Sequence, residues 1–159
     1  MAALNSFAPP PAARNNTSAP LPAVRNNSLA PPPAVRTHTV LVVDDNSALR
    51  QTAEAMLAAD GQHCIAVADS ITALCALVEH QPQVVLLDAD SGPLQAWQFV
   101  RLLQQHPVHK GTRLIYTSTR DDVIERARAL AAGIEQFLPK PFTTEELLAA
   151  VAGKLASAA

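Results

Sequence analysis

The sequence predicts an α/β domain in which five strands form a doubly wound parallel sheet, a (βα)5 chain. From residue 39 onward, short aliphatic runs alternate with amphipathic stretches, the pattern typical of a parallel sheet covered by helices on both faces. About 120 residues carry this pattern, a common size for a single hydrophobic core. Right-handed crossovers can place strands one, three, four and five side by side with strand two at an edge, so the expected strand order is 2-1-3-4-5.

The aliphatic runs are the candidate strands. In chain order they are TVLVV (39–43), CIAVA (64–68), VVLL (84–87), LIYT (114–117) and QFLP (136–139). The amphipathic segment after each run is the corresponding candidate helix.

The first helix is predicted between the first two runs, where residues at helical spacing would form one stripe facing the sheet. The stripe consists of Leu49, Thr52, Ala53, Met56 and Leu57. Ser47 is a candidate N-cap of this helix. Ser70 is a candidate N-cap of the second helix, which Pro82 would end.

The remaining three helices have start and stop signals of their own. The third follows Pro93, and the fourth covers residues 121–132 and stops at Gly133, because glycine is suited to a left-handed backbone. The fifth begins at Thr143, whose spacing to Glu146 is that of a capping box worth about 1 kcal/mol.

Residues 1–37 are predicted to be a disordered proline-rich tail, and residues 38–157 the folded domain. Residues 1–36 hold eight of the thirteen prolines, three arginines and no acidic residue. Proline removes backbone donors, and the aliphatic content is too low to offset the entropy lost on ordering. The remaining 9 basic and 14 acidic residues give the domain a net charge of −5, which argues against direct binding of nucleic acid.

Other residue types exclude further classes of protein. No run approaches the roughly 18 apolar residues of a membrane helix, so we expect a cytoplasmic protein that does not enter a membrane. Cys64 and Cys75 are too few and too far apart for a disulfide framework or a zinc site, and are predicted to be small core residues. Trp97 is predicted to pack within the helix layer.

Polar residues follow four of the five candidate strands. They are, after strands one, three, four and five, Asp44-Asp45, Asp88, Thr117-Ser118 and Lys140-Pro141. Because ligands bind at the carboxyl ends of the strands in an open parallel sheet, these groups are expected to share one pocket.

The carboxylates in this pocket indicate a cation and phosphoryl chemistry. Two carboxylates about 4 Å apart repel by roughly 4 kcal/mol at an effective dielectric of about 20. An all-oxygen site favours Mg²⁺ or Mn²⁺, with Asp45 and Asp88 as direct ligands and Asp44 acting directly or through water. Lys140 and Ser118 would contact the oxygens of a phosphoryl group, and Asp88 would be the attacking carboxylate.

Three motifs match one known family: VLVVDDN (40–46), VVLLD (84–88) and FLPKPF (137–142). With them, residues 39–156 resemble the response-regulator receiver domain of two-component signalling, a CheY-like domain with a flavodoxin-like fold. The resemblance implies that Asp88 accepts a phosphoryl group from a sensor histidine kinase or a phosphotransfer protein. It further implies Mg²⁺ held by Asp45, Asp88 and the backbone carbonyl of Asp90.

The same resemblance assigns a switch. Lys140 would contact the acyl phosphate, a hydroxyl of Ser118 (or Thr117) would move toward it, and Phe137 would turn inward. A cis Lys140-Pro141 bond is also expected. A downstream protein would dock on the face formed by the fourth helix, the fifth strand and the fifth helix. The candidate docking residues are Arg126, Glu135 and Gln136.

The sequence departs from the family in the loop after Asp88, where Gly92-Pro93 replaces the usual Met-Pro and Ala96 stands at a usual glycine. Thr119 replaces a smaller residue beside the phosphate, while Asp90 and Arg120 occupy two variable positions that tune the phosphate lifetime in the family.

Two alternatives therefore stay open. One is a degenerate receiver that signals by binding without phosphorylation. The other is a haloacid-dehalogenase-like phosphatase, suggested by the DAD of residues 88–90, although its acidic pairs would come in the opposite order. We expect a stand-alone signalling module, because no output domain follows, and not an enzyme.

Overall fold

The computed structural model describes residues 37–134 and 136–153. Residues 1–36 of the predicted tail, the docking candidate Glu135 and residues 154–159 lie outside the described part.

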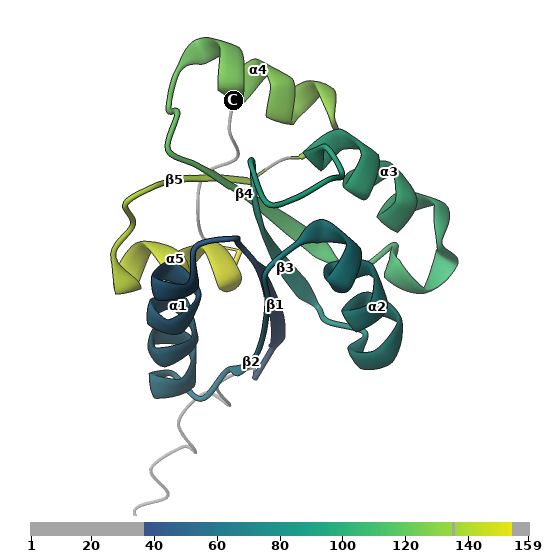
Figure 1. Ribbon diagram of the computed structural model, residues 1–159. Helices are drawn as coiled ribbons and strands as arrows, with labels where there is room; N and C mark the ends of the chain where they lie inside the picture. The colour runs from purple at the N-terminus through teal and green to yellow at the C-terminus, as the bar shows by residue number, and fades with distance from the viewer. Residues whose placement is uncertain (1–36, 135, 154–159) are drawn as a thin grey trace, which may run out of the picture. The chain divides into compact units, whose positions relative to one another are not determined.

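Five parallel strands form one sheet, in the order β2-β1-β3-β4-β5 (Figure 1). The strands are β1 (Thr39–Val43), β2 (His63–Val67), β3 (Val84–Asp88), β4 (Arg113–Ser118) and β5 (Gln136–Pro139). All four neighbouring pairs are parallel. The predicted fold class and strand order are confirmed.

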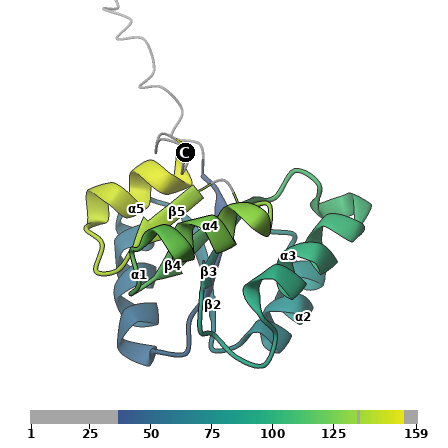
Figure 2. The ribbon, with the colours of Figure 1, turned by 90° about the horizontal axis from the view of Figure 1, so that it is seen from above.

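Helices cover both faces of this sheet, as Figure 2 shows from above. They are α1 (Ser47–Ala59), α2 (Ser70–His80), α3 (Ala96–Gln105), α4 (Val123–Ala131) and α5 (Thr144–Val151), with a short 3-10 turn at Pro107–His109. Helices α1 and α5 lie on one face, and α2 and α3 lie on the other.

Successive side chains of each strand point to opposite faces of the sheet, and this alternation produces the two layers. In β1, Val40 and Val42 pack into the core cluster that contains α1 and α5, whereas Leu41 and Val43 pack into the cluster of α2 and α3. These four side chains are essentially inaccessible to solvent, so β1, an interior strand of the sheet, is buried on both faces. Of the stripe predicted for α1, only Thr52 is wrongly placed, because it is exposed and its hydroxyl donates to the Ala48 carbonyl.

A third, smaller cluster holds α4. It consists of Val100 of α3, Tyr116 of β4, Ala129 of α4, Phe137 of β5, and Ile134, which lies between α4 and β5. Since α4 contributes only Ala129 to this core, most of its surface is left to polar contacts and solvent.

Two predicted N-caps were each placed one residue too late. Asn46, not Ser47, caps α1, accepting from the amides of residues 48 and 49. Asp69, not Ser70, caps α2, accepting from the amides of residues 71 and 72. Asn and Asp cap helices as well as Ser does, so the residue type alone could not decide between neighbours.

Other boundary signals are confirmed. Thr143 and Glu146 form the capping box at the start of α5. Gly133 has a φ of +84°, the left-handed conformation expected after α4. Helix α4 is shorter than predicted, because Asp122 caps it and its first residue is Val123.

Two core predictions are wrong. Trp97 is 52% exposed on α3, and Cys75 is exposed on α2. Cys64 is half-buried against the α1 layer, and burial raises its pKa to about 12. Among the described residues, no helix has both the length and the apolar character needed to cross a membrane.

Candidate functional site

The carboxyl ends of β1, β3 and β5 bring the predicted acidic residues and Lys140 together. One carboxylate oxygen from each of Asp44, Asp45 and Asp88 lies within 4.8 Å of the others. The Lys140 Nζ atom donates to Asp88 Oδ1 at 2.5 Å and to Asp44 Oδ2 at 2.6 Å. These contacts join segments that are far apart in the sequence, as the parallel topology predicts.

The turn after β1 is fixed by its own hydrogen bonds. The Asn46 amide donates to Asp44 Oδ1 at 2.8 Å, and the Arg50 guanidinium donates to the carbonyls of Asp44 and Asp45 at 2.7 and 3.0 Å. As a result the Asp44 side chain is buried against Lys140, whereas Asp45 is exposed at the rim of the pocket.

Lys140 is positioned by the end of β4. Its amide donates to the Ser118 carbonyl at 2.9 Å, which extends the pairing of β4 with β5 by one residue. The Lys140-Pro141 peptide bond is cis, as expected from the motif.

The three paired groups are buried, with side-chain exposures of 8% for Lys140, 3% for Asp44 and 7% for Asp88. Burial disfavours the charged carboxylate and raises the pKa of Asp88, although Lys140 opposes this effect. Burial also opposes the charge on Lys140, but its hydrogen bonds to Asp44 and Asp88 prevail and its pKa is raised. The pocket therefore holds one ammonium group between two carboxylates.

The donor set fits a hard divalent cation. All three acids offer oxygen ligands, and within the described ranges the Asp45 carboxylate has no hydrogen bond or ion pair to compete with a metal. The Asp90 carbonyl accepts from the Gly92 amide at 2.9 Å, which leaves it one lone pair. Exposure of Asp45 beside two buried acids suits an ion that keeps several of its waters.

The two candidate hydroxyls differ in their hydrogen bonds. Thr117 Oγ1 donates to the Leu87 carbonyl at 3.4 Å, so its proton is used within the sheet. Ser118 Oγ accepts from the Arg120 amide at 3.0 Å and keeps its own proton for another acceptor. This difference favours Ser118 as the hydroxyl that contacts a ligand.

Phe137, the predicted switch aromatic, is buried in the third core cluster. Its ring lies 5.8 Å from that of Tyr116, and the guanidinium of Arg126 lies 4.8 Å from the Phe137 ring centroid. In this structure Phe137 is therefore already turned toward the core.

The loop after Asp88 is anchored to the start of α2. The Ser70 amide donates to the Ser91 carbonyl at 3.0 Å, and the Leu94 amide donates to Ser70 Oγ at 3.1 Å. Gly92 has a φ of +107°, and a Cβ atom there would lie 3.0 Å from the Cβ of Asp69. The unusual Gly92-Pro93 sequence thus accompanies a loop that packs tightly on its neighbour.

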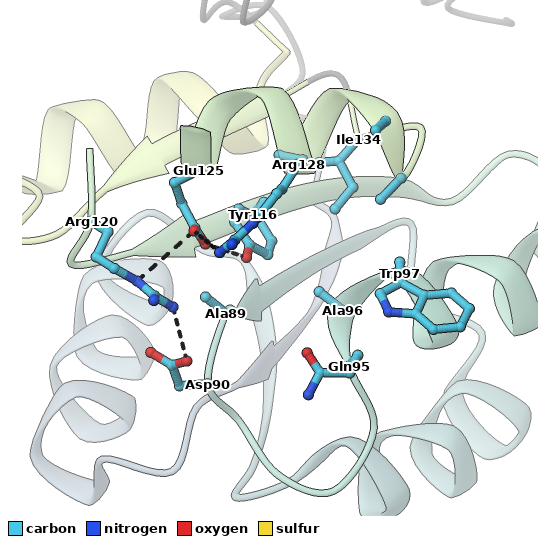
Figure 3. Close-up of a pocket in the computed structure, with 13 residues that line it drawn as sticks. Ala89, Asp90, Gln95, Ala96, Trp97, Tyr116, Arg120, Glu125, Arg128 and Ile134 are labelled. Carbon is cyan, nitrogen blue, oxygen red and sulfur yellow. Dashed lines mark hydrogen bonds and ion pairs between the residues drawn. The ribbon is translucent and has the colours of Figure 1, made fainter. Parts of the chain in front are cut away.

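A cluster of charged groups lies beside the site; its Asp90 and Arg120 were singled out from the sequence, but Glu125 was missed. Glu125, at the start of α4, is buried and accepts from the Tyr116 hydroxyl at 2.7 Å (Figure 3). Arg120 lies between Glu125 and Asp90, with nitrogen–oxygen distances of 3.9 and 3.2 Å. These residues line a pocket of about 630 Å³ between α3 and α4. No motif spacing links them, so only the fold brings them together.

The chain matches the model of the response regulator receiver domain over residues 40–152. It is 32% identical to protein PilG of Pseudomonas aeruginosa over 112 residues, and this alignment covers 70% of the chain and 83% of PilG. It is 34% identical to response regulator MprA of Mycobacterium sp. strain KMS over 110 residues, and this alignment covers 69% of the chain and 47% of MprA. The chain thus spans about half the length of MprA.

Solved structures agree with these sequence relatives. The chemotaxis response regulator CheY4 of Vibrio cholerae superposes with a TM-score of 0.70 at 25% identity, covering 75% of this chain and 99% of CheY4. The five-stranded order described above is the order of that fold. The chain therefore belongs to the response regulator receiver domain family, the signalling modules of two-component systems.

Proposed function

We propose that Asp88 is the phosphoacceptor of this receiver domain. The observation that carries the proposal is the pair of contacts from Lys140 to Asp88 and Asp44, at 2.5 and 2.6 Å. A lysine buried against the acceptor carboxylate can offset the charge of an acyl phosphate, and this supports phosphorylation at Asp88. A separate contact argues against the phosphatase alternative. Asp90, the second acid of the DAD sequence, pairs with Arg120, whereas a general acid would face the substrate.

The proposed reaction is a single phosphoryl transfer. An Asp88 carboxylate oxygen attacks the phosphorus of a phosphohistidine, the phosphorus–nitrogen bond breaks, and the histidine nitrogen keeps the electron pair. Lys140 stays close to the new acyl phosphate and offsets its negative charge. Ser118 donates its free proton to a phosphoryl oxygen, a role supported by its position at the end of β4 and by its hydroxyl proton, which no described hydrogen bond uses.

Mg²⁺, or Mn²⁺, is the proposed cofactor. The residues that would hold it are Asp45 and Asp88, with Asp44 bound directly or through water and the remaining lone pair of the Asp90 carbonyl as a further ligand. When bound, the ion supplies positive charge to the oxygens of the phosphoryl group.

The proposed partners are a sensor histidine kinase or a phosphotransfer protein as donor, and a downstream protein as target. The target would dock on the α4-β5-α5 face, where Arg126 and the half-buried Gln136 lie. Phosphorylation would reach this face through Ser118 and Phe137, because Phe137 packs against α4 and carries Arg126 above its ring.

Radiolabelled acetyl phosphate tests the acceptor directly. With millimolar Mg²⁺, the full chain is expected to carry an acid-stable, base-labile label, and Asp88→Asn is expected to carry none. Asp60→Asn is the matched control, since Asp60 lies in the turn at the far end of α1 and should leave labelling intact.

Other outcomes would support the alternatives. A wild-type chain that takes up no label while binding a partner would support the degenerate receiver. Steady hydrolysis of a phosphate ester, lost in Asp88→Asn, would support the phosphatase.

A further inference from the structure

Glu125 has a buried carboxylate that the proposed phosphoryl transfer does not use. Its side chain is only 3% exposed, and burying a charged carboxylate is costly unless the surroundings pair it. Three groups do so here: the Tyr116 hydroxyl at 2.7 Å, Arg128 Nη1 at 3.6 Å and Arg120 Nε at 3.9 Å. A buried, paired carboxylate such as that of Glu125 can fix the positions of the side chains that contact it.

Arg120 is the contact that links Glu125 to the acceptor. Its guanidinium reaches Asp90 Oδ1 at 3.2 Å, and its amide donates to Ser118 Oγ at 3.0 Å. The Asp90 amide in turn donates to Asp88 Oδ2 at 3.2 Å. The half-exposed guanidinium is thus held between Glu125 of α4 and Asp90 of the acceptor loop (Figure 3).

We propose that Glu125 is a positioning residue that holds the Arg120 guanidinium against Asp90, two residues after Asp88, where its positive charge draws in the anionic phosphoryl donor. The Tyr116 hydroxyl anchors Glu125, and Asp90 holds the outer side of the guanidinium. Without the inner contact, Asp90 alone restrains the Arg120 guanidinium, from its outer side. The inference rests on the proposed function, because it requires phosphorylation of Asp88.

Glu125→Asp tests the proposal without changing the net charge. It withdraws the carboxylate from Arg120 by about one carbon–carbon bond, and we expect the rate constant for labelling by acetyl phosphate to fall roughly threefold to tenfold, at the low end of electrostatic steering effects. Arg120→Gln should reduce the rate by a similar factor. In the double variant the Glu125→Asp change should have no further effect, because the side chain it positions is gone.

Two further measurements separate positioning from a general loss of structure. The rate difference between wild type and Glu125→Asp should disappear at about 1 M salt, where the screening length is about 3 Å. Glu54→Asp, an exposed position on α1, is the matched control and should label at the wild-type rate. If Glu125→Asp folds poorly, Tyr116→Phe removes the anchor of Glu125 with the charges intact and should slow labelling in the same salt-dependent way.

The outcomes are distinguishable from failure of the acceptor assignment. A wild-type chain that is never labelled would overturn the proposed function. A labelled wild type whose rate is unchanged in Glu125→Asp would overturn the inference alone. So would a Glu125→Asp effect of equal size with and without Arg120.

Discussion

Replacing Lys140 by methionine removes the ammonium group and keeps most of the apolar stem. Two buried carboxylates, Asp44 and Asp88, then lose the cation that contacts both of them at 2.5–2.6 Å. Breaking a buried ion pair by removing one partner costs about 3–5 kcal/mol, because an uncompensated charge is left behind. In a domain of about 120 residues, each kcal/mol shifts Tm by roughly 3–6 °C, so a loss of this size lowers Tm by roughly 10–30 °C.

Thermal and urea unfolding of the metal-free protein at pH 7 measure this loss. Asp88→Asn combined with Lys140→Met should recover about 1–2 kcal/mol, because one of the two unpaired buried charges is removed. Lys110→Met is the matched control, since Lys110 is exposed, and it should change stability by less than about 0.5 kcal/mol.

The pH dependence of the Lys140→Met effect follows from the same charges. The raised pKa of Lys140 means that its stabilising contribution is fully present below 10.5 and is lost as pH rises through the higher folded value. On the acid side the stability difference between wild type and variant should narrow as Asp88 becomes protonated, because the variant then holds one unpaired buried charge fewer. A metal-free Lys140→Met protein within 1 kcal/mol (about one hydrogen bond) of wild type at pH 7 would refute the electrostatic reasoning.

Three further outcomes are expected. Burial raises the pKa of Asp88 above 3.8, so its ionised form destabilises the fold and Asp88→Asn should stabilise the metal-free protein at neutral pH. The gain in unfolding free energy should vanish as pH falls below 3.8, and a lower stability of Asp88→Asn at neutral pH would contradict the prediction. Millimolar Mg²⁺ should raise the Tm of wild type by more than that of Asp88→Asn, and equal shifts would argue against Asp88 as a ligand. Asn46→Ala should cost about 1 kcal/mol in urea unfolding, whereas Ser47→Ala should cost little, and the reverse order would restore Ser47 as the cap.

Periodicity and strand-end residues were sufficient to predict the fold and the meeting of Asp44, Asp45, Asp88 and Lys140. These features are determined by the topology, since parallel strands deliver their last residues to one edge. The hydrogen-bonded neighbour of each strand follows from the crossover rule. Which residues meet at this edge of the sheet could therefore be predicted without knowing the side-chain conformations.

The sequence could not predict contacts that depend on packing between helices. Nothing in the spacing of Tyr116 and Glu125 shows that one lies under the other, because the angle of α4 to β4 decides it. Trp97 is exposed for a related reason, as an apolar residue type predicts burial only where a neighbouring element covers it. Choices between adjacent residues, such as Asn46 and Ser47, depend on backbone angles that residue type leaves open.

The attachment of the acceptor loop to Ser70 has a consequence for exchanging parts between receivers. Grafting residues 89–95 from a relative with a differently shaped loop would leave the Ser70 amide and hydroxyl without the partners they have here. Conversely, a bulkier residue at Gly92 would push the chain off Asp69 and move the Asp90 carbonyl with it. The start of α2 and the loop after β3 therefore form a single transplantable unit, and a working chimaera must carry both.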